Sequence, residues 1–231
     1  YSQSVILSIL MFLLLTNIQS TFVLRQHIAI GITLLSYPYI IERKHIKFLL
    51  LMLIAFLFHK TAIIFLPIYY IYGIKSPKRT IILLSIGFII AIFAMRFLFM
   101  YLGGLIGGYD TYILDDENGA NAKTGIFYTL YLVCYIVFCG KKCIEPGMNR
   151  FILYTLIISC IINVAGLGLS LISRLGLYYN VILILAIPLI YANIKNNGLK
   201  YAFLIITLLV FGYINFGGSR YEFIAPYALS L

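Results

Sequence analysis

Long runs of apolar residues alternate along this chain with short clusters of basic residues. Several of the runs reach or approach the ~18–20 residues that a helix needs to cross the hydrocarbon core of a bilayer. The strands of a transmembrane β-barrel show a different pattern, with alternating polarity over segments of about ten residues. The sequence therefore predicts an all-α fold, that of a polytopic integral membrane protein with about eight helical segments.

The apolar runs can be assigned to individual membrane spans. The run at residues 5–18 has no basic residue before it and no small-residue cleavage site after it, so we do not interpret it as a signal peptide. We expect residues 1–231 to form a single transmembrane domain within a longer protein. The other predicted spans cover residues 21–41, 80–102, 125–138, 151–169, 175–193 and 201–214. Pro188 is expected to kink the span at residues 175–193.

The positions of the basic residues predict which ends of the spans face the cytoplasm. Lys and Arg are concentrated in cytoplasmic loops, and four clusters hold most of the 17 Lys and Arg residues of the chain. This assignment places the acid-rich loop at residues 103–123 on the outer side. The clusters that we expect in the cytoplasm are residues 42–47, 75–79, 141–150 and 195–200.

Residues 48–74 form an apolar stretch with His59 and Lys60 at its centre. Both flanks are basic, so two short helices joined at His59 and Lys60 would return to the cytoplasmic side, whereas one continuous helix would leave a basic cluster outside. Each half is about 17–21 Å long, shorter than the ~30 Å hydrocarbon core, so this broken hairpin would turn in the outer half of the membrane. Such a turn must be buried or face water, which predicts a hydrated cavity open to the outside. The alternative is a single tilted helix with a snorkelling Lys60.

Composition supports a membrane protein and argues against nucleic-acid binding. The chain is 63% hydrophobic and only 10% charged, whereas a soluble domain has about 25% charged residues. The net charge of +10 fits cytoplasmic loops, so no nucleic acid is expected as a partner. The four cysteines lack the paired CxxC spacing of zinc sites. The acids within residues 115–118 could bind a divalent ion or act as a base, but they are expected to be solvated in a loop. We therefore predict neither a metal nor another cofactor.

Several basic residues fall outside the cytoplasmic clusters and gather in the outer half of the predicted topology. No acidic residue within the spans is an obvious partner for them. Unpaired cations at this depth suggest an anionic ligand, and the planar guanidinium of arginine donates two parallel hydrogen bonds to a phosphate. These residues are Arg25, Lys60, Arg96, Arg174 and Arg220.

Each of these residues also has a purely structural explanation. Arg25 can reach the external headgroups by snorkelling, Arg174 can anchor its helix at the interface, and Arg220 can be solvated in a loop. His27 lies two residues from Arg25, and residues at i and i+2 of a helix point to different faces, so we expect His27 to serve packing. His59 is the stronger candidate for an acid, a base or a ligand contact, because a broken helix presents it.

Three stretches of the sequence, and a fourth more loosely, resemble a known family. They are RQHIAIGITLLSYPYIIERKHIKFLL (25–50), IAFLFHKTAIIFLPIY (54–69), SRLGLYYN (173–180) and, with the looser fit, YINFGGSRYEFIAPY (213–227). In this order they resemble the EpsG family of Wzy-type polysaccharide polymerases. The most specific part of the resemblance is a span that begins with Arg-Gln and is followed downstream by a Phe-His segment.

The resemblance implies a membrane glycosyltransferase. Its substrate would be an undecaprenyl-diphosphate-linked oligosaccharide in the outer leaflet of the bacterial plasma membrane. The enzyme would transfer the growing glycan from its lipid diphosphate to a sugar hydroxyl of the next repeat unit, and so build a capsule, an O-antigen or an exopolysaccharide. The resemblance also suggests partners for the enzyme, namely membrane lipids, a regulator of chain length and a flippase.

The site residues follow from the motifs by position. Arg25 and Gln26 match the Arg-Gln pair, and Thr61 matches the hydroxyl position after the Phe-His segment. Cations would stabilise the negative charge that develops on the diphosphate leaving group, and a general base would take the proton of the acceptor hydroxyl. The predicted catalytic residue is His59, and the residues predicted to bind the diphosphate or the glycan are Arg25, Gln26, Lys60, Arg174, Tyr178 and Arg220.

Three other activities compete with this hypothesis. A lipid-linked glycan flippase also needs a basic cavity, but transporters often contain paired broken segments in two related halves, and only one is evident in the sequence. A membrane O-acyltransferase uses an apolar-flanked histidine, yet it gives no reason for several unpaired arginines. An O-antigen ligase shares the donor and the leaving group with a polymerase and differs only in the acceptor.

Overall fold

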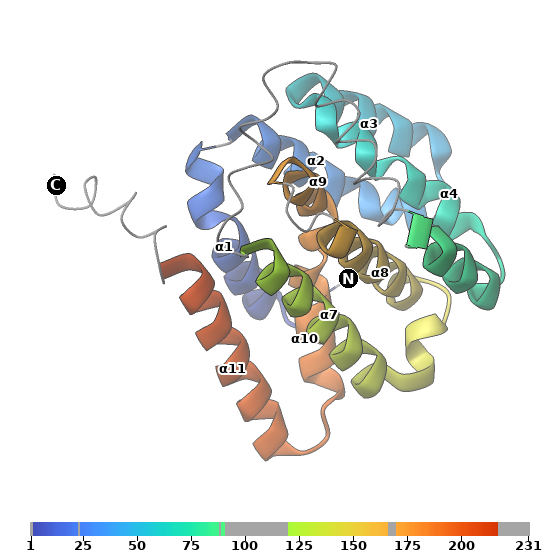
Figure 1. The fold of residues 1–231 in the computed structure, drawn as a ribbon. Helices are drawn as coiled ribbons and strands as arrows, with labels where there is room; N and C mark the ends of the chain where they lie inside the picture. The colour runs from blue at the N-terminus through green and yellow to red at the C-terminus, as the bar shows by residue number, and fades with distance from the viewer. Residues whose placement is uncertain (1, 23, 88, 91–119, 166–169, 217–231) are drawn as a thin grey trace, which may run out of the picture.

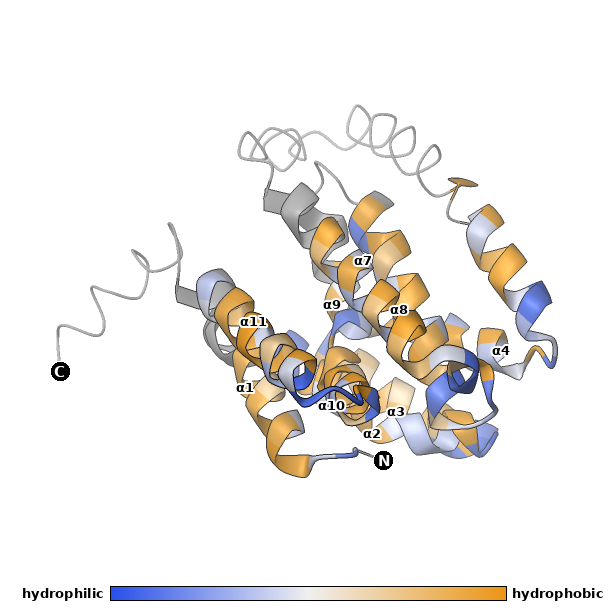
Figure 2. Cartoon of the chain, turned by 90° about the horizontal axis from the view of Figure 1, so that it is seen from below, coloured by the Kyte–Doolittle hydropathy of each residue, from blue (hydrophilic) through white to orange (hydrophobic). Residues whose placement is uncertain are grey.

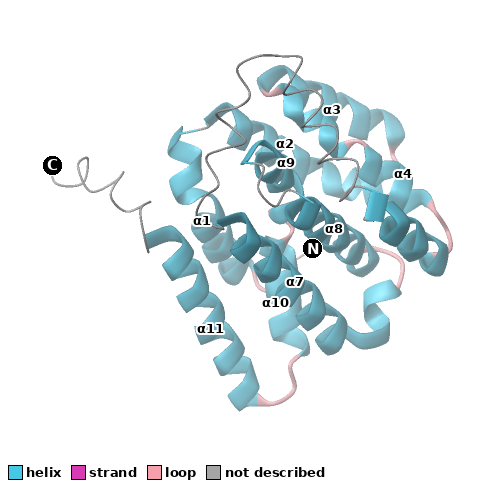
Figure 3. Cartoon of the chain, in the orientation of Figure 1, coloured by secondary structure: helices cyan, strands magenta, loops and turns pink. Residues whose placement is uncertain are grey.

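The computed structural model describes residues 2–22, 24–87, 89–90, 120–165 and 170–216, and every regular element in these ranges is helical (Figure 1, Figure 3). The all-α prediction is thereby confirmed. Arg96 and Arg220, and the predicted outer loop as far as residue 119, lie outside the described residues. The following helix already begins at Ala120, so residues 120–123, which were assigned to that loop, are helical.

The described elements follow the predicted spans closely. Residues 77–87 are also helical, at the start of the predicted span 80–102. The elements are α1 (Val5–Phe22), α2 (Leu24–Ile41), α3 (His45–Phe58), the 3₁₀ helix η1 (Lys60–Phe65), α4 (Pro67–Gly73), α7 (Ala120–Cys139), the 3₁₀ helix η2 (Gly140–Ile144), α8 (Met148–Ala165), α9 (Ser170–Asn180), α10 (Leu183–Asn193) and α11 (Asn197–Phe216).

The surface of the bundle is apolar, as expected for a protein that contacts lipid. Within the described residues, two helical stretches are long and apolar enough to cross a membrane, Gly125–Ile144 and Leu175–Asn193, and several shorter apolar helices accompany them. Large apolar side chains point outward, with Leu57 of α3 75% exposed and Leu209 of α11 67% exposed. Extended exposed apolar faces mark surfaces that contact a membrane or a partner, so the fold is consistent with a membrane protein.

The broken hairpin predicted at residues 48–74 is present. α3 ends at Phe58, and His59 has an extended backbone with φ −152° and ψ 116° before η1 begins. The rings of Phe48 and Tyr69 then stack with their centroids 4.9 Å apart, although a continuous helix would separate them by about 31 Å. The chain therefore reverses at His59, and α4 returns alongside the start of α3.

The four basic clusters lie at the same end of the bundle, which we call the basic end. Arg43 donates a hydrogen bond to a backbone carbonyl of α4, the helix that leads into the second cluster. The hydroxyl of Tyr72 in α4 accepts a hydrogen bond from the N–H of Gly147, in the third cluster, at 3.0 Å. Asn193, just before the fourth cluster, contacts Cys139, just before the third, at 3.8 Å. The hydrophilic loops are visible at the ends of the apolar helices in Figure 2.

The predicted span 175–193 is divided into α9 and α10. Val181 and Ile182 form a turn in which the N–H of Ile182 bonds to the carbonyl of Tyr179, three residues back, at 3.1 Å. The side chain of Asn180, the last residue of α9, is hydrogen-bonded to α8. The interruption therefore follows Asn180, whereas Pro188, the expected kink, lies inside α10.

A hydroxyl from another helix compensates for Pro188. Proline has no N–H, so it cannot donate to the carbonyl of Ile184 four residues earlier. The hydroxyl of Ser8 in α1 donates to this carbonyl at 2.6 Å. An unpaired backbone group is costly within a membrane, and this hydrogen bond therefore joins α1 to α10 where the proline interrupts the ladder.

Replacing Ser8 with alanine should lower the free energy of unfolding by about 1 kcal/mol, because it leaves the carbonyl of Ile184 unpaired. Ser36→Ala is the matched control, since the Ser36 hydroxyl donates at 2.6 Å to a carbonyl of its own helix. Unfolding in mixed detergent micelles measures both changes. Equal stability of the Ser8→Ala and parent proteins would show that the hydrogen bond contributes nothing.

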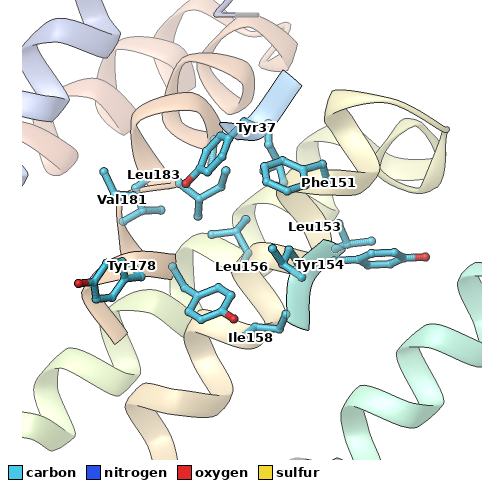
Figure 4. Packing of buried hydrophobic residues seen from close by; sticks show 14 of the residues in the cluster. Tyr37, Phe151, Leu153, Tyr154, Leu156, Ile158, Tyr178, Val181 and Leu183 are labelled. Carbon is cyan, nitrogen blue, oxygen red and sulfur yellow. The ribbon is translucent and has the colours of Figure 1, made fainter. Parts of the chain in front are cut away.

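Aromatic residues from α2, η1, α8 and α9 meet in the core. Tyr37 stacks on Phe65 with ring centroids 5.7 Å apart, and its ring meets the edge of Phe151 at 4.8 Å. Phe65 in turn lies 5.2 Å from Tyr179. Figure 4 shows Tyr37 and Phe151 within the apolar side chains of this cluster. This packing holds η1 and α9 against each other, and it therefore positions the candidate site.

Candidate functional site

The tip of the broken hairpin, which we define as residues 59–64, packs directly against α9. The hydroxyls of Thr61 in η1 and Tyr178 in α9 are 3.1 Å apart and share a hydrogen bond. The next residue, Tyr179, donates from its hydroxyl to the carbonyl of Ile64 at 2.6 Å. The N–H that a 3₁₀ helix would offer to this carbonyl is missing, because the residue three positions on is Pro67. Two motifs separated by more than a hundred residues thus meet through tyrosine hydroxyls.

The start of α2 lies level with the hairpin tip. α2 and α3 pack side by side and run antiparallel (Figure 1). His27 and His59 are equally far along the chain from the turn that joins these helices, and both helices rise at the same rate per residue. The Arg25–Gln26 pair therefore lies at the height of Lys60 and Thr61, at the end of the bundle opposite the basic end.

The predicted site residues differ in their exposure. His59 is partly buried and Lys60 is exposed, so the two residues at the break face different surroundings. Gln26 is buried with 2% exposure, whereas its neighbour Arg25 is exposed. Tyr178 is fully buried, and in Figure 4 its hydroxyl turns away from the apolar side chain of Leu156.

Not every predicted residue is brought into contact. Thr61 and Tyr178 touch each other, and His59 and Lys60 directly precede Thr61 in the chain. Arg174 is placed only by the backbone of α9, one helical turn before Tyr178, and residues four apart lie on the same helix face. Its side chain and the whole of Arg220 lie outside what the structure describes, so their role stays a prediction.

The comparison with protein families decides the classification. A model described as the EpsG family matches residues 1–229. The chain belongs to the EpsG family. Membership indicates a membrane protein of polysaccharide biosynthesis. No protein with a curated description matches the chain, and no solved structure matches it.

In this EpsG-family protein, a buried polar cluster beside the site was missed by the sequence analysis. We call the side chains of Ser159 and Asn163 in α8 and Asn180 in α9 the amide cluster. Asn180 accepts hydrogen bonds from Ser159 at 2.5 Å and from Asn163 at 2.8 Å. The sequence did contain a signal for this cluster, because all three are polar residues within apolar runs. Polar side chains in such runs often form hydrogen bonds to neighbouring helices.

The charge distribution of the EpsG-family chain favours an anionic ligand at the hairpin tip. The acidic residues in the described part of the chain are Glu42 and Glu145, and both belong to the basic end. Glu42 is already paired with Lys44 at 2.6 Å. Arg25 and Lys60 lie at the opposite end, so no described carboxylate neutralises them. Among the described residues, no three His, Cys, Asp or Glu side chains are grouped to hold a metal ion.

Proposed function

We propose that this chain is a Wzy-type polysaccharide polymerase that joins undecaprenyl-diphosphate-linked repeat units in the outer leaflet of the plasma membrane. One observation carries the proposal: the interrupted helix at His59 is packed against α9 through the 3.1 Å contact between Thr61 and Tyr178. Irregular backbone at membrane depth is tolerated where it is buried or lines a wet cavity. At this break Thr61 of the hairpin motif meets Tyr178 of the motif in α9.

The proposed reaction is a glycosyl transfer. The bond between the anomeric carbon of the growing glycan and the diphosphate oxygen breaks, and the same carbon bonds to a sugar hydroxyl of the incoming unit. That hydroxyl loses its proton to His59, which acts as general base. Undecaprenyl diphosphate leaves with the bonding electrons, and cations in a site of low dielectric constant stabilise its charge.

The other site residues bind the substrate in this proposal. Arg25 and Arg174 hold the diphosphate through paired hydrogen bonds, and Lys60 and Arg220 add positive charge. Gln26 and Tyr178 bind glycan hydroxyls. The chemistry uses side chains alone, so it requires neither a metal nor a cofactor.

The gathering of the four basic clusters at one end of the bundle supports an outward-facing site. If the basic end faces the cytoplasm, the hairpin tip lies in the outer half of the membrane, where flipped repeat units arrive. A flippase that supplies these units and a regulator of chain length are the protein partners that fit this placement.

A flippase is the second candidate, and one structural observation favours it. The apolar segment formed by α9 and α10 is a second broken one, and its first half, α9, contacts the hairpin through Tyr178. Transporters often build their substrate sites from paired broken helices. In this case the same basic site would carry the lipid diphosphate across the bilayer without transferring the glycan.

Arg25→Ala and Arg174→Ala separate the two candidates in cells. We expect single lipid-linked repeat units in the outer leaflet and no long polymer, because the diphosphate is no longer held. Arg79→Ala, an exposed arginine of the basic end, is the control and should leave polymer at the parental level. Analysis of lipid-linked sugars in each leaflet reports the result. Units confined to the inner leaflet would favour the flippase, and full-length polymer would show that the assigned site is wrong.

A further inference from the structure

We propose that the amide cluster of Ser159, Asn163 and Asn180 is a positioning device that fixes α9 against α8 and so keeps Tyr178 at the hairpin tip. Its consequence for catalysis rests on the proposed function, but the fixed position of α9 can be tested separately. None of these side chains contacts the hairpin tip in the structure, so they act through α9.

The geometry of the amide cluster fixes both the distance and the rotation of α9. The Asn180 side-chain oxygen accepts from Ser159 at 2.5 Å and from Asn163 at 2.8 Å, and Asn163 also donates to the backbone carbonyl of Ser159 at 2.7 Å. All three residues are buried, with exposures of 0%, 3% and 4% for Ser159, Asn163 and Asn180. Two donors directed at one oxygen allow little rotation of the helix that carries it.

A glycine also lies at this contact between the two helices. A Cβ at Gly176 would lie 3.4 Å from side-chain atoms of both Asn163 and Asn180. Small residues at helix contacts allow close approach within membranes, and polar side chains then bond across the interface. Gly176 and Asn180 are one turn apart in α9, so they face α8 together.

The path from the amide cluster to the hairpin tip is short. Tyr178 and Tyr179 immediately precede Asn180, and they bond to Thr61 and to the carbonyl of Ile64. A rotation of α9 would therefore move both tyrosine hydroxyls away from η1. In enzymes, a displacement of about 1 Å caused by a substitution away from the reacting atoms can cost about 10²-fold in rate.

Asn180→Leu tests the inference, since leucine has a similar size and accepts no hydrogen bond. Tyr131→Phe is the matched control, because it removes a buried hydrogen bond of 3.1 Å to Thr207 between α7 and α11. We expect faster amide hydrogen exchange in α9 and η1 of Asn180→Leu and unchanged exchange there in Tyr131→Phe.

The activity measurement uses lipid-linked repeat units extracted from the source cells. For Asn180→Leu we expect kcat to fall by about 10²-fold with little change in KM, because the cations that hold the diphosphate remain. Tyr131→Phe should keep the parental kcat. Parental exchange in α9 of Asn180→Leu, or faster exchange with a parental kcat, would overturn the inference. If the parent protein forms no polymer, the proposed function fails, while the exchange data still decide whether the amide cluster fixes α9.

Discussion

His59→Ala should lower the kcat of polymer formation by about 10²–10⁴-fold, the contribution typical of a general base. His59 interrupts the helix between α3 and η1 with an extended backbone, whose N–H donates to the carbonyl of Ala55 and whose carbonyl accepts from the N–H of Ala62. The imidazole is partly buried, and it directly precedes Lys60 and Thr61 at the contact with α9. Loss of the imidazole removes the proton acceptor and leaves the bound diphosphate in place, so KM should change little.

His45→Ala is the matched control for this substitution. His45 begins α3 at the basic end, where its ring lies 5.1 Å from the ring of Tyr69, and it should keep parental kcat. A general base must be neutral, so the parental rate should fall as the pH is lowered through the titration of His59. The residual activity of His59→Ala should lack this pH dependence. A kcat for His59→Ala within threefold of the parental value would exclude His59 as the base.

Arg174→Lys and Arg174→Ala should both lower kcat, by about 10²–10³-fold for alanine, the effect typical of removing one group that stabilises transition-state charge. Lysine retains the charge but cannot donate the two parallel hydrogen bonds of a guanidinium. It should therefore recover only part of the activity. Arg174 shares a helix face with Tyr178, whose hydroxyl meets Thr61.

Arg150→Lys is a suitable control for the arginine series. Arg150 lies at the basic end, with its guanidinium carbon 5.3 Å from the centre of the Tyr72 ring, and its replacement should leave kcat unchanged. The measurement is the initial rate of polymer formation by purified protein at saturating lipid-linked repeat units. A parental rate for Arg174→Lys would mean that charge alone is sufficient, and a parental rate for Arg174→Ala would remove Arg174 from the site.

The hairpin could be predicted because two independent signals agreed. Basic residues flank residues 48–74 on both sides, and a His-Lys pair lies at the centre of the apolar stretch. A continuous helix would conflict with both signals at once. The structure places the reversal at His59, and the stacking of Phe48 on Tyr69 confirms it.

The interruption between α9 and α10 could not be predicted in the same way. Val181 and Ile182 are apolar residues within an apolar run, and the recognisable helix breaker is Pro188. The residue before the break, Asn180, bonds through its side chain to Ser159 and Asn163 in α8. Such a contact between distant segments leaves no local pattern. The hydrogen bond from Ser8 to the carbonyl freed by Pro188 is a second case of this kind.

The candidate site was predictable in its composition more than in its contacts. The motifs named Thr61 and Tyr178 separately, and the structure adds that their hydroxyls meet at 3.1 Å. The sequence also grouped Arg25 with these residues, and the antiparallel packing of α2 and α3 places it at the same height. Ser159 was overlooked because a serine in an apolar helix often bonds only to its own backbone.

The central claim, that this protein transfers a glycan from a lipid diphosphate, is tested most directly with purified protein in liposomes. The liposomes contain lipid-linked repeat units extracted from the source cells, and the two products, glycan and undecaprenyl diphosphate, are separated and measured. The account predicts glycans of several repeat units, with one undecaprenyl diphosphate released for each bond formed, and about 10²–10⁴-fold slower formation of both products with His59→Ala. Movement of intact units between leaflets, with no release of undecaprenyl diphosphate, would contradict it.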